Sequence, residues 1–244
     1  MTLLAIKGLE VNYDMIRAVT AVELVVREGE IVALVGANGS GKSSIVRAIC
    51  GVQRPRAGSI TFFGQRLDHL PPHRIMGMGI AHVPEGRRIF SNMTLRENLL
   101  LGAHHRNDKD QVAQDIESDI KLFPSLGSRL DEHACNLSGG ELQMLALLRG
   151  MIARPRLLIL DEPSLGLAPR VVAGLFHILE NLRDRGLTIL LVEQNIRQAL
   201  TTADRGYVME SGRVLLSGTA PDLLADDKVV QVYLGTSRLG RDVN

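Results

Sequence analysis

One eight-residue stretch, Gly36 to Ser43, constrains this sequence more than any other. It fits the phosphate-binding pattern G-x-x-x-x-G-K-[ST]. The apolar run Ile31–Val35 before it predicts a buried strand, and Ser44–Cys50 after it predicts a helix that ends at Gly51. A strand, a glycine loop and a helix in this order aim backbone N–H groups and the positive end of the helix at one point. The context therefore favours a nucleotide-phosphate site over a chance glycine-rich turn.

Each residue type in this loop has a physical reason to be there. The glycines let the backbone turn and approach a phosphate without a Cβ in the way. We expect Lys42 to reach the β- and γ-phosphates and the Ser43 hydroxyl to ligate Mg²⁺, with Ser44 as a further donor. The residues predicted to bind the nucleotide here are Gly36, Ala37, Asn38, Gly39, Ser40, Gly41, Lys42, Ser43 and Ser44.

Two carboxylates follow a second apolar run. Leu157–Leu160 predicts a fully buried parallel strand, and Asp161 and Glu162 come directly after it. The carboxyl ends of parallel strands form the edge where open α/β sheets bind ligands. We assign Asp161 to Mg²⁺ and Glu162 to the general base that polarises an attacking water. The alternative, an acidic flank for a helix near Val171, is less consistent with a phosphate loop upstream.

A second glycine cluster lies in Leu137-Ser138-Gly139-Gly140-Glu141, called the signature below. Ser138 and Glu141 fit a capping box, which is the purely structural interpretation. Two glycines in a first turn destabilise a helix, and close approach of a phosphate would explain them. Because the chain already has one phosphate loop, we infer that this second anion site serves the nucleotide of another subunit.

Composition limits the function classes. The 244 residues suit one α/β domain or a core with one insertion. Lysine plus arginine, 28, nearly balance aspartate plus glutamate, 27, so no nucleic-acid partner is expected. Two cysteines are too few for a disulfide framework, which favours a reducing compartment. No apolar stretch approaches the roughly 20 residues that span a bilayer, so we expect a soluble chain that reaches a membrane only through a partner.

The rest of the chain alternates strands and helices around a helical stretch. Tyr13 lies between two predicted strands and is either a half-buried strand aromatic or a ring on which adenine stacks. From Glu85 to about Ala153 the pattern becomes helical, which predicts an insertion in the α/β core. Predicted strands are 4–9, 21–26, 59–64, 80–83, 188–192, 205–210 and 214–217, and predicted helices are 73–76, 94–101, 108–122, 138–151, 171–185 and 196–202, followed by two short helices from Pro221 and a frayed end.

Together the phosphate loop, the signature and Leu157–Glu162 with Pro163-Ser164 make the chain resemble the ATPase subunit of an ABC transporter over nearly its whole length. The resemblance implies an α/β fold with a P-loop NTPase (RecA-like) core, an N-terminal antiparallel β subdomain and an inserted helical subdomain. The implied divisions of the single domain 1–244 are 1–84 and 155–218 for the core, 85–154 for the helical subdomain and 219–244 for a C-terminal helical tail.

The same resemblance implies how the sites are used. Two such subunits dimerise head to tail around two ATP molecules, each held between the phosphate loop of one subunit and the signature of the other. Tyr13 falls at the adenine-stacking position, and Leu165–Pro169 resembles the loop that crosses the dimer seam.

Two positions depart from the family pattern. Glu85 stands where a glutamine is usual; it can still ligate Mg²⁺ but adds negative charge, which Arg87 and Arg88 can offset. Gln194 stands where the switch histidine is usual. Its amide can donate to a γ-phosphate oxygen but cannot carry a proton, so we expect slower hydrolysis at this subunit's own site.

These departures resemble one importer branch, the second ATPase subunit of branched-chain (hydrophobic) amino-acid uptake systems. Matching segments are Val83–Phe90, Val192–Asn195, Ser164–Pro169 and Ala203–Val208. The resemblance implies a related ATPase partner, or a second copy of this chain when it is isolated, together with two membrane permeases and an external solute-binding protein. It also implies a place at the cytoplasmic face of the inner or plasma membrane. Nothing in the chain is expected to touch the amino acid.

Other functions stay open at this point. The subunit could bind ATP but barely hydrolyse it, or serve a transporter for urea, amides or lipids. A soluble ABC-type ATPase of DNA repair or translation usually carries a long coiled-coil insertion or two ATPase units, and neither is present here. A kinase would have no use for the signature.

Overall fold

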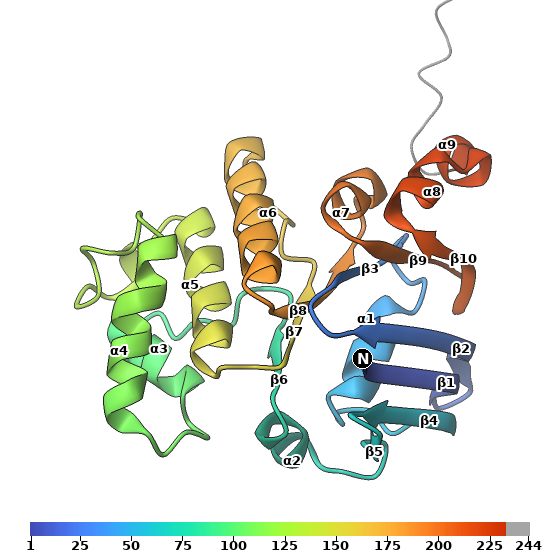
Figure 1. Ribbon diagram of the computed structural model, residues 1–244, viewed down its shortest axis with the longest axis horizontal. Helices are drawn as coiled ribbons and strands as arrows, with labels where there is room; N and C mark the ends of the chain where they lie inside the picture. Colours follow the sequence, from blue (N-terminus) through green and yellow to red (C-terminus); the bar gives the residue numbers. More distant parts are fainter. Residues whose placement is uncertain (233–244) are drawn as a thin grey trace, which may run out of the picture.

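A computed structural model describes residues 1–232, in which two β-sheets and their helices form the layers seen in Figure 1. The larger sheet has the strand order β10-β9-β3-β8-β7-β6, and the smaller has the order β2-β1-β4-β5. The strands are β1 (Thr2–Tyr13), β2 (Ile16–Arg27), β3 (Ile31–Gly36), β4 (Ala57–Phe62), β5 (Gln65–Arg66), β6 (Ile80–Val83), β7 (Leu157–Asp161), β8 (Thr188–Glu193), β9 (Arg205–Glu210) and β10 (Arg213–Thr219).

The helices connect these strands and continue beyond the last one. They are α1 (Lys42–Ile49), α2 (Pro72–Gly77), α3 (Leu95–Gly102), α4 (Lys109–Asp119), α5 (Gly139–Ile152), α6 (Pro169–Asp184), α7 (Ile196–Thr202), α8 (Ala220–Ala225) and α9 (Asp227–Val232).

The larger sheet is parallel from β6 to β9 and is buried on both faces. Strand β3 pairs in parallel with β8 and β9, and only the β9–β10 pair is antiparallel. Successive β3 residues point to opposite cores, Ala33 into one and Leu34 into the other. This double burial explains why β3, β7 and β8 appear in the sequence as continuous apolar runs without alternation.

Opposite faces of this sheet carry different helices. Helices α1 and α2 pack into the core that also contains the smaller antiparallel sheet, whereas α3 to α8 pack into the core on the other face. In Figure 1 the green and yellow helices α3, α4 and α5 accordingly stand together, well away from α1.

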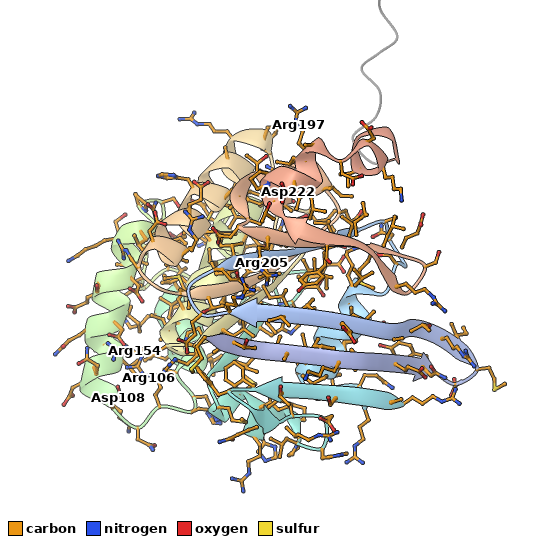
Figure 2. The ribbon with its side chains drawn as sticks, turned by 45° about the vertical axis from the view of Figure 1, so that its right-hand side comes forward. Arg106, Asp108, Arg154, Arg197, Arg205 and Asp222 are labelled. Carbon is orange, nitrogen blue, oxygen red and sulfur yellow. The ribbon has the colours of Figure 1, made fainter. Side chains whose placement is uncertain are left out.

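A cluster of charged side chains ties α4 to the end of α5. Asp115 pairs with Arg106 at 2.6 Å and with Arg154 at 2.5 Å, and Asp108 pairs with Arg106 at 2.7 Å. Figure 2 shows Arg106, Asp108 and Arg154 gathered at this edge. Because α4 has only a short apolar stripe, these ion pairs and Val112 with Ile116 fix it to the rest.

The long hairpin of β1 and β2 extends further than the sequence pattern predicts. Tyr13, predicted between two strands, is the last residue of β1 and pairs with Ile16. Several register shifts interrupt the hairpin, and its outer face is polar, so the period-two signal is lost near the tip. In the part of the chain that the structure describes, no helix is long and apolar enough to cross a membrane.

The predicted stretch 85–154 contains α3, α4 and α5, and the predicted tail contains α8 and α9. The exact division into core, insertion and tail stays a prediction. The frayed end expected after the two short helices lies outside the described residues.

Candidate functional site

The phosphate loop, residues 36–43, begins at the carboxyl end of the buried strand β3 and enters α1 at Lys42. Gly41 is the N-cap of α1 and has φ 103°, a left-handed conformation that favours glycine. A Cβ on Gly36 would lie 2.3 Å from the Met209 carbonyl oxygen, and one on Gly41 would lie 2.6 Å from that of Ala18. Neighbouring backbone therefore surrounds the loop closely, and only glycine fits at these two positions.

Lys42 is the cation of this loop and is almost fully buried, with 3% of its surface exposed. Its Nζ donates to the carbonyl oxygens of Gly36 at 2.9 Å and Ala37 at 3.1 Å. It also lies 3.7 Å from Oε1 of Glu162. Because these contacts come from its own loop and from the residue after β7, the ammonium group is held in one place at the phosphate loop.

Glu162 follows β7 and has a backbone conformation that non-glycine residues rarely adopt, with φ 50°. Its N–H donates to the carbonyl oxygen of Val192 at 2.9 Å. Its carboxylate accepts a hydrogen bond from Nε2 of Gln194. The structure thus brings the three predicted catalytic side chains, Lys42, Glu162 and Gln194, to one point.

Asp161 ends β7 and is 8% exposed. Burial raises the pKa of this carboxyl to about 6, with further increases from the nearby charges of Glu162 and Glu85. A hydrogen bond from Ser43 and the charge of Lys42 oppose that rise in pKa. Ser43 and Glu85, the other two residues predicted to ligate Mg²⁺, therefore both influence the pKa of Asp161.

A divalent cation fits the chemistry of this place. Oδ1 of Asp161 is buried and has no hydrogen-bond partner, which leaves a carboxylate oxygen available to a cation or its waters. Within residues 1–232, no three His, Cys, Asp or Glu side chains form a preassembled metal cluster. Mg²⁺ needs no such cluster, since it usually combines one or two carboxylates with waters and substrate phosphates.

The other predicted nucleotide contacts differ in exposure. Ala37, Asn38 and Gly39 are exposed at the tip of the loop, while Ser43 and Ser44 lie on the first turn of α1. Tyr13 is half-buried and packs against the core that contains α1, with its hydroxyl buried and without a partner. Its role as an adenine platform stays a prediction.

The signature forms the start of α5. Ser138 is the N-cap: its Oγ accepts from the Glu141 N–H at 3.3 Å, and the Glu141 carboxylate accepts from the Ser138 N–H at 2.8 Å. Arg129 adds an ion pair to Glu141 at 2.5 Å. The predicted capping box is confirmed, so the glycines between these two residues stand in a turn whose polar ends are already satisfied.

The two signature glycines face different neighbours. A Cβ on Gly140 would lie 2.9 Å from a Val171 methyl, and one on Gly139 would lie 3.2 Å from the Arg87 guanidinium. The structure places the Arg87 guanidinium beside the signature; that Arg87 offsets the charge of Glu85 stays a prediction. The sequence did not predict the contact between Arg87 and Gly139, because the two residues are far apart along the chain.

The phosphate loop and the signature belong to opposite faces of the larger sheet. Apolar residues of α1 pack into the core with the antiparallel sheet, and those of α5 pack into the other core. Figure 1 shows the two helices on different sides of β7 and β8. Glu193, the last residue of β8, is a buried acid that was not among the predicted site residues. A charged residue at the end of an apolar strand was the available signal.

Comparison with known proteins agrees with this arrangement. The family model described as ABC transporter matches residues 19–165. The high-affinity branched-chain amino acid transport ATP-binding protein BraG of Pseudomonas aeruginosa is 47% identical, over 91% of this chain and 95% of that protein. The lipopolysaccharide export system ATP-binding protein LptB of Escherichia coli is 32% identical, over 96% of this chain and 98% of that protein.

Solved structures show the same fold. The ATP-binding subunit of an ABC transporter superposes with a TM-score of 0.82 at 30% identity, covering 95% of this chain and 96% of that one. The ADP conformation of MJ1267, an ATP-binding cassette of an ABC transporter, superposes with a TM-score of 0.86 at 24% identity, covering 96% and 99%.

Proposed function

Because this chain belongs to the ABC transporter family, we propose that it is the ATPase subunit of an importer for branched-chain or other hydrophobic amino acids. The chain has the ATP-binding and ATP-hydrolysing domain of that family. The observation that carries the ATPase role is the meeting of Lys42, Glu162 and Gln194 beside the phosphate loop.

Each of these side chains has a role that its contacts support. Lys42 stabilises the β- and γ-phosphates, because a buried ammonium interacts strongly with charge that develops on transferring oxygens. Glu162 accepts the proton of the attacking water, and Gln194 orients that carboxylate and donates to a γ-phosphate oxygen. Mg²⁺, when bound by Ser43, Asp161 and Glu85, would neutralise charge on the β- and γ-oxygens.

The signature completes a second, different nucleotide site. Ser138 and the N–H groups of Gly139 and Gly140 are at the exposed start of α5, where backbone donors and the helix dipole favour an anion. Because α1 lies on the other face of the sheet, the phosphate held there belongs to the ATP of a partner subunit. Closure of two ATPase subunits around ATP, and their reopening after hydrolysis, is then the motion passed to two membrane permeases.

The importer assignment rests on the identity to BraG, which is 47%. The identity to LptB, a lipopolysaccharide export protein, is lower at 32%, so a role in lipid export is less favoured. We place the chain at the cytoplasmic face of the membrane, bound through the permeases and served by an external solute-binding protein. A related ATPase is the expected partner in the assembly.

Reconstitution tests this proposal. The chain, its partner ATPase and the two permeases are placed in lipid vesicles that contain ATP and Mg²⁺. The solute-binding protein is added outside, and uptake of labelled leucine, urea and a lipid is compared. We expect ATP-dependent leucine uptake that Lys42→Ala abolishes. Transport of urea or lipid but not leucine would overturn the cargo, and transport that survives Lys42→Ala would overturn the motor role.

A further inference from the structure

Three consecutive residues at the end of β8 each hold a different part of the segment that carries Glu162. The Val192 carbonyl oxygen accepts from the Glu162 N–H at 2.9 Å. Oε1 of Glu193 accepts from the Ser164 N–H at 3.0 Å. Gln194 then donates its side-chain amide to the Glu162 carboxylate.

Glu193 is the least expected of the three. It is only 2% exposed, and burial raises the pKa of its carboxyl, while hydrogen bonds from Ser164 oppose that rise. Among the described residues, no lysine, arginine or histidine pairs with it. A buried acid without a cation is costly, and an apolar residue would fill the space at the end of a strand equally well. Its carboxylate oxygens instead accept two backbone N–H groups, those of Ser164 and Gln194.

The segment that Glu193 holds needs such support. Glu162 has φ 50°, and a non-glycine residue in this region is strained unless its surroundings impose the conformation. Only one residue separates it from Ser164, so the Ser164 N–H bond to Glu193 fixes the chain on the far side of the strained residue. The Val192 bond fixes the near side.

We propose that Glu193 is a positioning residue for hydrolysis: it clamps the backbone after Glu162 so that the Glu162 carboxylate stays between Lys42 and Gln194. Glu193 acts through the backbone N–H groups of Ser164 and Gln194, to which its carboxylate is bound. The proposal rests on the proposed role of Glu162 as the general base. It predicts that Glu193 affects the rate of the chemical step and leaves nucleotide binding unchanged.

The test compares two substitutions with a matched control in the purified full-length protein. Glu193→Gln keeps the shape and one acceptor oxygen, and Glu193→Ala removes both acceptors. The control is Glu30→Gln. Glu30 is also a poorly exposed acid that accepts a backbone N–H, from Arg27, but it pairs with Arg205 and precedes β3, at the strand end opposite the phosphate loop. Steady-state kcat and KM for ATP, and binding of a fluorescent ATP analogue, are measured for each variant.

We expect Glu193→Ala to lower kcat tenfold or more and Glu193→Gln to lower it less, with KM and analogue binding changed less than twofold. Glu30→Gln lowers the unfolding midpoint without lowering kcat. Because Glu193 and Gln194 act on the same carboxylate, the double variant Glu193→Gln/Gln194→Ala loses less than the product of the single losses.

Equal kcat for Glu193→Gln and the unmodified protein would overturn the positioning role, as would a loss that Glu30→Gln shares. A rise in KM with kcat unchanged would also overturn it. If Glu193→Ala does not fold, Glu193→Gln alone decides, because it preserves shape. Should the unmodified protein, alone and with its partner ATPase, fail to hydrolyse ATP, the proposed function itself fails; that result is distinct from normal hydrolysis by both Glu193 variants.

Discussion

The phosphate loop and the signature both put glycines at the start of a helix, but their surroundings differ. In the phosphate loop, Lys42 is buried and already bound to carbonyl oxygens and to Glu162. In the signature, Ser138 and Gly139 are exposed, and the capping hydrogen bonds of Ser138 join it to Glu141 in the same turn. Lys42 is thus fixed by its neighbours, whereas Ser138 and Gly139 face outward. This difference supports the proposal that the chain carries one half of each of two nucleotide sites.

The largest expected effect concerns Glu162, beside the phosphate loop. Glu162→Gln keeps the shape of the side chain but removes the base, so ATP hydrolysis should fall by about a hundredfold or more. ATP binding should persist and hold two subunits together, which gel filtration with ATP and Mg²⁺ measures. Steady-state hydrolysis near the unmodified rate would contradict the assignment of Glu162.

A pH experiment probes the same region in the absence of nucleotide and Mg²⁺. Folding raises the pKa of Asp161 to about 6 from its ordinary value of 3.8. A raised pKa contributes stability below about pH 4, and that contribution is lost as the pH rises through about 6, on the order of 2–3 kcal/mol. Asp161→Asn should therefore gain stability relative to the unmodified protein as the pH rises from 4 to 7. Urea unfolding at several pH values measures the difference in free energy of unfolding between Asp161→Asn and the unmodified protein. A difference that does not change with pH would refute the raised pKa of Asp161.

The signature offers a contrast between its own two glycines. Gly140→Ala should destabilise the fold by about 1–3 kcal/mol, because its Cβ meets Val171 at 2.9 Å in a packed contact. Gly139→Ala meets only the flexible end of Arg87 and should cost less than about 0.5 kcal/mol. Thermal unfolding of both variants compares them. Equal losses would show that the signature is not packed as described.

The smallest effect concerns the switch position. Gln194→His restores a group that can carry a proton, so single-turnover hydrolysis should rise about threefold or more, which corresponds to about 0.7 kcal/mol of barrier. A histidine control at the exposed Gln114, on α4, should change nothing. If Gln194→His does not raise the single-turnover rate, Gln194 is no reason to expect slow ATP hydrolysis by this subunit.

Local patterns in the sequence identified most of this fold and site. The phosphate loop, the buried strand before Asp161 and the capping box of Ser138 each follow from a short stretch whose physics is local. The extent of β1 was missed because its outer face is polar and its register is irregular. The neighbours of Gly139 and the clamp at Glu193 depend on tertiary contacts between segments that are far apart in the sequence.

Complementation between two inactive variants tests the central claim most directly. Lys42→Ala disables the phosphate loop, and Gly139→Asp puts a carboxylate where the signature would meet a phosphate; the aspartate faces Arg87 and starts a helix, so the fold should persist. If each ATP lies between two subunits, a mixed head-to-tail dimer has one intact site, and mixing the variants restores about a quarter of the unmodified ATPase activity. If one chain uses its own loop and its own signature on the same ATP, no mixture regains activity, and that result would contradict the account.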